Sequence, residues 1–167
     1  MIKKIPLDAE PHIVYGLLQN LSYKEHLAIS EFVDNSIQSF IDNKEKLKKL
    51  KQKSVKVEVK TTDDFISITD NAGGISSKDF SHAFRLTKPE ALKKTNSLNE
   101  YGVGMKTAAL WFGSRFEIQT SALGEKKKHT IIFDLDEIRE NQLDSLKDIK
   151  EEDEKLDAHY TTIKISK

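Results

Sequence analysis

The stretch AISEFVDNSIQSF, residues 28–40, carries three polar side chains whose types and spacing could do chemistry. Glu31, Asp34 and Asn35 are spaced i, i+3 and i+4, so a helix over this stretch brings all three onto one face. The amide oxygen of Asn35 is a neutral ligand of a kind that Mg²⁺ accepts, and the Glu31 carboxylate can accept a proton from water. A solvated polar helix face has the same spacing, so the trio alone leaves both interpretations open.

A second informative stretch is SITDNAGGI, residues 67–75, in which Asp70 ends an expected strand and two glycines follow. A carboxylate at this place can accept a hydrogen bond from an exocyclic amine such as that of adenine. The glycines let the backbone lie close against a flat base. The same composition is typical of an ordinary turn, and turn chemistry alone would also explain it.

The third stretch is EYGVGMKTAAL, residues 100–110, which suggests phosphate binding without matching a common phosphate loop. A dinucleotide fingerprint needs a third glycine and a preceding strand, and a Walker loop needs glycine directly before its lysine. What remains is general physics. Gly102 and Gly104 leave amides unobstructed at an expected helix start, where amides and dipole attract an anion, and Lys106 adds a positive charge.

The elements that must position these residues are helices first and a mostly antiparallel sheet after them. Apolar residues recur at helical spacing in the first part of the chain, and later segments alternate apolar and polar residues as strands do. The charged stretch 42–53 is interpreted as a solvated helix end or loop, and the stretch 147–159 as an exposed connection. The expected elements are two helices between residues 11 and 43, a hairpin over 54–70, a loop over 76–101, a helix from 104, a hairpin over 115–135 and a last strand over 161–166. This order predicts a two-layer α/β (α+β) sandwich.

Composition limits the classes of protein that fit. The 167 residues suit a single domain over 1–167, with 37% hydrophobic and 32% charged residues. Because 27 basic residues balance 27 acidic ones, net charge gives no support to direct nucleic-acid binding. No cysteine is present, so disulfides and thiol catalysis are excluded. No apolar run reaches membrane length, and we expect a cytoplasmic protein with no membrane association.

The order and spacing of the three stretches resemble the GHKL superfamily of ATPases. This superfamily includes the gyrase B subunit, the ninety-kilodalton heat-shock chaperone, MutL, histidine kinases and the microrchidia (MORC) proteins. EFVDNS resembles its helical Glu-x-x-Asp-Asn box, DNAGGI its adenine box and YGVGMK its lid-end glycine box. YTTIKI resembles the Gly-Thr-x-hydrophobic box, with Thr162 at the threonine position, although Ala72 and Thr161 stand where glycine is usual. The motifs look closest to MORC-like and related bacterial ATP-binding proteins.

The resemblance implies a Bergerat ATP-binding fold, a mostly antiparallel sheet covered by helices on one face, with ATP and Mg²⁺ as cofactors. It implies that Glu31 is the general base, Asn35 the direct protein ligand of magnesium and Asp70 the contact to the adenine amino group, supported by Thr162. Residues 76–101 would form a lid, and FRLTKPE resembles its phosphate side. The other nucleotide-binding positions that it implies are Asp34, Gly74, Ile75, Thr87, Lys88, Tyr101, Gly102, Val103, Gly104, Met105 and Lys106.

The resemblance also implies magnesium-dependent binding of ATP and slow hydrolysis, with lid closure coupled to dimerisation of a larger machine. In gyrase- and chaperone-like relatives a following transducer domain supplies a lysine or arginine to the γ-phosphate. This chain ends at Lys167, directly after its last expected strand, so we expect an N-terminal fragment without its transducer or effector domains. Two alternatives are a non-hydrolysing regulatory module that binds nucleotide and a histidine-kinase catalytic domain. No phospho-acceptor helix precedes the domain, which disfavours the kinase.

Overall fold

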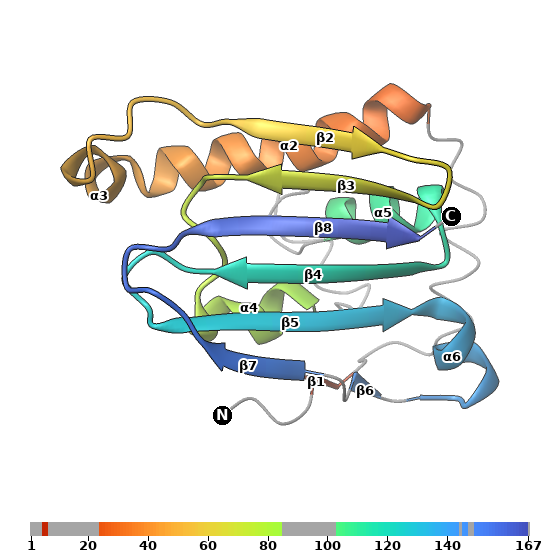
Figure 1. The fold of residues 1–167 in the computed structure, drawn as a ribbon. Coiled ribbons are helices and arrows are strands. Elements are labelled where there is room, and N and C mark those ends of the chain that lie inside the picture. Colours follow the sequence, from red (N-terminus) through yellow and green to blue (C-terminus); the bar gives the residue numbers. More distant parts are fainter. Residues whose placement is uncertain (1–4, 7–23, 85–102, 144, 147–148, 167) are drawn as a thin grey trace, which may run out of the picture.

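The computed structural model of the chain describes residues 5–6, 24–84, 103–143, 145–146 and 149–166 (Figure 1). Thr87, Lys88, Tyr101 and Gly102, four of the predicted nucleotide-binding residues, lie outside this described part, as do most of the predicted lid and the first expected helix.

A six-stranded sheet in which every neighbouring pair is antiparallel forms the centre of the fold (Figure 1). Its spatial order is β2 (Val57–Thr61), β3 (Phe65–Asp70), β8 (Tyr160–Ser166), β4 (Arg115–Ser121), β5 (Lys127–Asp134) and β7 (Ile149–Asp153). The last strand of the chain is therefore central, between two strands that come much earlier. Two short strands, β1 (Ile5–Pro6) and β6 (Ser145–Leu146), form a separate pair.

Helices lie against one face of this sheet, as Figure 1 shows for the three that stand behind the strands. They are α2 (Glu25–Asp42), α4 (Ser77–Phe84) and α5 (Val103–Phe112). Two short helices, α3 (Lys44–Lys49) and α6 (Leu135–Glu140), follow α2 and β5. This confirms the predicted fold class, a Bergerat-type α/β sandwich with helices on one face of an antiparallel sheet.

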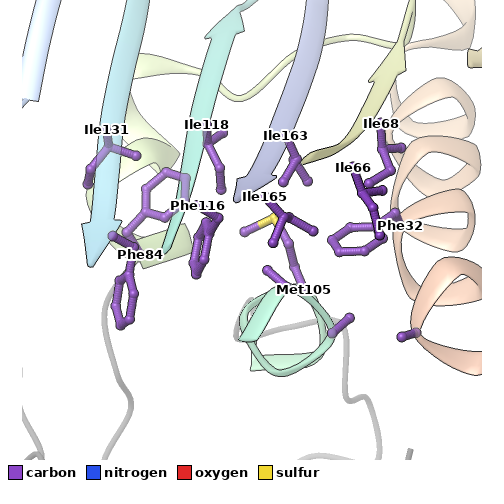
Figure 2. Packing of buried hydrophobic residues seen from close by; sticks show 14 of the residues in the cluster. Phe32, Ile66, Ile68, Phe84, Met105, Phe116, Ile118, Ile131, Ile163 and Ile165 are labelled. Atoms are coloured by element: carbon purple, nitrogen blue, oxygen red, sulfur yellow. The ribbon is translucent and has the colours of Figure 1, made fainter. Parts of the chain in front are cut away.

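The core lies between this sheet face and the helices. Successive side chains of a strand point to opposite faces, so one in two faces the helices. Register places Ile163 opposite both Ile68 and Ile118, which forms an apolar row across three strands. Figure 2 shows Phe32 of α2 and Met105 of α5 meeting this face. Burying such side chains contributes about 1.5–3 kcal/mol each, which fixes the helices on the sheet.

Two local expectations differ from the structure. The lysine-rich segment after α2 contains a short helix, α3, because Leu47 is fully buried there. Residues 149–153, expected in an exposed connection, form edge strand β7 instead. Ile149 pairs with Ile131 on β5, and Lys127 contacts both Glu151 and Asp153. Charged edge strands of this kind are easily mistaken for loops, because they lack the alternation of apolar and polar residues that indicates a strand.

Candidate nucleotide site

A cavity of about 290 Å³ lies between α2, α4, α5 and the ends of β3 and β8. It combines apolar walls with a few polar groups, as small-molecule sites usually do. Five of the predicted site residues line it: Asn35, Asp70, Gly74, Ile75 and Met105. The structure thus brings together residues that the sequence separates by 70 positions.

Asp70 is held at one wall of the cavity by two hydrogen bonds. The backbone amide of Ala72 donates to Oδ1 at 2.8 Å, and the hydroxyl of Ser36 donates to Oδ2 at 3.0 Å. Burial raises the pKa of Asp70 above its ordinary value, and these hydrogen bonds oppose that rise by favouring the carboxylate. Asp70 is therefore a fixed, poorly solvated hydrogen-bond acceptor that faces the cavity.

Ser36 and His159 support this acceptor, and neither was predicted from the sequence. Ser36 is only 4% exposed and also contacts the Phe32 carbonyl at 2.9 Å, one turn earlier on α2. His159 donates from Nδ1 to the Ala72 carbonyl at 2.7 Å, because a carbonyl can only accept. The spacing of Phe32, Asn35 and Ser36, which puts all three on the cavity side of α2, was the available signal for Ser36.

The glycines after Asp70 lie against neighbouring elements. Gly74 has a φ of +69°, and a Cβ placed there would overlap the backbone carbonyl of Ser121 at the end of β4. Glycine is therefore required by both conformation and space. The amide of Gly73 donates to the Ser39 hydroxyl of α2 at 3.1 Å, which holds the loop against the helix.

Glu31 lies at the start of α5 rather than in the cavity wall. A Cβ placed on Gly104 would overlap Oε2 of Glu31, so this carboxylate touches the first turn of α5. Glu31 and Asn35 are both half-buried, one turn apart on α2. Asp34, expected to share their face, is exposed and does not line the cavity, since its Cα lies about 100° around the helix from that of Asn35.

The two residues after Gly104 lie in different surroundings. Met105 is buried, lines the cavity and reaches from α5 toward Ile163 and Ile165 (Figure 2). Lys106 is only 2% exposed and does not line the cavity. Burial lowers the pKa of Lys106 to about 7. Val103, also predicted to bind nucleotide, is the first residue of α5.

The structure corrects the prediction for Thr162. Asp70 pairs directly with Thr161, so these two side chains share the face that the helices cover, and Thr161 lines the cavity. Thr162 points to the opposite face, where its hydroxyl lies 3.1 Å from that of Thr69. The sequence held a signal for this. Of the two threonines in YTTIKI, Thr161 has an apolar residue two positions later, Ile163, whereas Thr162 has Lys164.

The antiparallel sheet, the helices on one face and the half-buried carboxylate followed by two glycines match a domain of the GHKL type. A family model described as histidine kinase-, DNA gyrase B- and HSP90-like ATPase matches residues 23–166, and the chain belongs to this family. No curated protein matches the chain. Within the described residues, no helix is both long and apolar enough to cross a membrane.

Proposed function

We propose that this domain binds ATP with Mg²⁺ in the cavity beside Asp70 and hydrolyses it slowly. Membership of an ATPase family supports ATP binding. The observation that carries the proposal is the Asp70 carboxylate, which Ser36 and Ala72 hold in place at the cavity wall. Each carboxylate oxygen can accept more than one hydrogen bond, so Asp70 can also accept from an exocyclic amine.

The walls around Asp70 suit a flat base. Ile68 and Ile163 from the sheet, Met105 from α5 and Phe32 from α2 supply apolar surface. The backbone at Gly74 has no side chain that could obstruct a planar ring. Adenine offers both the apolar faces and the amine that this arrangement would recognise.

Hydrolysis would use Glu31 and Asn35, two half-buried polar residues of α2. Asn35 lines the cavity and would give its side-chain oxygen to Mg²⁺, which takes its other ligands from phosphates and water. Among the described residues, no group of three or more His, Cys, Asp or Glu could hold a metal ion. Glu31 would accept a proton from the water whose oxygen attacks the γ-phosphorus, while the bond to the bridging oxygen breaks and ADP leaves.

We further propose that ATP binding is coupled to dimerisation of a larger machine. Support for this coupling comes from the resemblance of YGVGMK and EFVDNS to the motifs of GHKL ATPases. Cytoplasmic location and a particular likeness to MORC proteins stay predictions from the sequence.

Calorimetric titration with ADP and with a non-hydrolysable ATP analogue, with and without Mg²⁺, tests the binding step. At a ligand concentration a hundredfold above Kd, we expect stabilisation of about 2.7 kcal/mol against thermal unfolding. Asp70→Asn puts an amide donor near the amine and should weaken binding at least about tenfold, the cost of losing a charged hydrogen bond. Asp63→Asn, a change to an exposed turn carboxylate, is the matched control. Equal affinities for the two variants would show that Asp70 does not contact the nucleotide.

Phosphate release tests the hydrolytic step separately. Glu31→Gln should keep nucleotide binding and abolish turnover, because the amide cannot accept the proton from water. A wild-type protein that binds ATP but releases no phosphate would favour the regulatory module without hydrolysis. Turnover at the wild-type rate in Glu31→Gln would remove Glu31 from the mechanism.

A further inference from the structure

The start of α4 is fastened to the turn between β4 and β5 by an unusual set of contacts. Ser76 caps the helix, since its hydroxyl accepts from the Asp79 amide at 3.2 Å and donates to the Asp79 carboxylate at 2.6 Å. Ser77 then gives both its backbone amide, at 3.0 Å, and its hydroxyl to the carboxylate of Glu125. A carboxylate also complements the dipole at this helix end.

His129 completes this cluster from inside the fold. It is 1% exposed, and its Nε2 lies 2.8 Å from the Ser77 hydroxyl oxygen. The single hydroxyl proton of Ser77 points to Glu125, so the Nε2 of His129 must carry the proton of the second hydrogen bond. Its Nδ1 has no hydrogen-bond partner among the described residues. The ring also packs on Phe80 of α4, with ring centroids 4.9 Å apart.

The loop that precedes α4 is tied to β4 and to the turn that follows β4. The amide of Ile75 donates to the Thr120 hydroxyl at 2.9 Å, and the Leu123 amide donates to the Gly73 carbonyl at 3.0 Å. Thr120 is fully buried, and its hydroxyl donates a hydrogen bond to the Tyr160 carbonyl at 2.9 Å. The segment from Asp70 to α4 therefore has little freedom to move away from β4.

These contacts bear on the candidate site because α4 forms part of its wall. Asp79 and Ala83, about one turn apart on α4, line the same cavity as Asp70. Their position relative to Asp70 depends on where α4 begins. Glu125, Ser77 and His129 touch the start of that helix, yet none of the three lines the cavity.

We propose that Ser77, Glu125 and His129, the α4 clasp, are positioning residues for nucleotide binding. They hold the α4 wall at the distance from Asp70 that a bound base needs. This inference rests on the proposed function, because it assumes that the nucleotide occupies this cavity. Glu31, Asn35 and Gly104 belong to α2 and α5, so the clasp governs affinity and leaves turnover at saturation unchanged.

The test compares clasp variants with loss of a cap on another helix. Asp134 accepts from the Glu137 amide at 3.0 Å and caps α6, which does not line this cavity. Glu125→Ala and Asp134→Ala each remove one capping carboxylate, so both should lower the melting temperature. Calorimetry with ADP, well below both melting temperatures, should show affinity weakened about tenfold for Glu125→Ala, as expected for a lost charged hydrogen bond, and unchanged for Asp134→Ala.

A milder pair keeps the test valid if Glu125→Ala does not fold. Ser77→Ala removes the shared hydroxyl, whereas Ser77→Thr keeps it and should restore both the ADP affinity and the KM for ATP. In each variant that turns over ATP, KM should change and kcat should not. If the wild type binds ADP and the clasp variants bind it equally well, the clasp only stabilises the fold and this proposal fails alone. If the wild type binds no nucleotide, the proposed function fails and the clasp proposal with it.

Discussion

Lys106 should make the stability of this domain depend on pH in the alkaline range. The side chain is 2% exposed in the first turn of α5, and burial lowers its pKa from the ordinary 10.5 to about 7. The unfolded chain therefore binds a proton at Lys106 between about pH 7 and pH 10.5 that the folded chain has released. Stability rises with pH wherever the unfolded state binds more protons.

The size of this effect follows from the two pKa values. Their difference corresponds to about 5 kcal/mol in total, of which about 2 kcal/mol falls between pH 7 and pH 9. Below pH 7 both states carry the charge, so the slope from Lys106 vanishes there. Lys106→Met keeps most of the buried chain volume and removes the charge, so it should stabilise the fold at pH 7 and abolish this rise.

Urea unfolding followed by circular dichroism at pH 7, 8 and 9 measures the rise. Between pH 7 and pH 9, the free energy of unfolding of the wild type should increase by about 2 kcal/mol more than that of Lys106→Met. For the control Lys46→Met, a change to an exposed lysine of α3, the free energy of unfolding should rise with pH as it does for the wild type. Parallel curves for wild type and Lys106→Met would show that Lys106 stays charged in the fold to pH 9, and the account of its burial would be wrong.

Three further substitutions test the geometry of the site. Gly104→Ala should push aside the flexible Glu31 carboxylate, so phosphate release should fall sharply while ADP affinity and melting temperature stay near wild type. Normal turnover in this variant would show that the position of Glu31 at α5 does not matter for catalysis. Thr161→Val should weaken ADP binding in calorimetry and Thr162→Val should not, because only Thr161 shares the face of Asp70. The reverse result would contradict the strand register.

Much of the fold could be predicted from alternation and helical spacing. In β3, β4 and β8, buried residues alternate with more exposed ones over part or most of the strand, a pattern that is visible in the sequence. β7 could not be predicted in this way. Its IKEED sequence has one apolar residue, and its pairing with β5 uses cross-strand charges such as Lys128 with Glu152.

Residues of the candidate site could be predicted from the sequence where few other residue types could take their place. Asp70 and Gly74 belong to this group, because a strand-end carboxylate and a glycine with positive φ have few substitutes. Glu125 and His129 do not. Glutamate and histidine occur throughout soluble proteins, and their roles here arise only where the start of α4 meets the β4–β5 turn and β5. Contacts between distant elements leave no local pattern.

Thr161 and Thr162 show how strictly strand geometry limits such inferences. Successive side chains alternate between faces, so an error of one position moves a predicted contact to the other side of the sheet. Because Asp70 pairs with Thr161, the threonine that can act with this carboxylate is determined by register and not by resemblance to a motif. The hydroxyl oxygen of Thr161 in turn lies 3.3 Å from that of Thr120, which accepts a hydrogen bond from the amide of Ile75, just before α4. Thr120 pairs with both Thr161 and His129, so the proposed base contact and the α4 clasp lie on one row of the sheet, and we expect weakening either to lower the affinity for nucleotide.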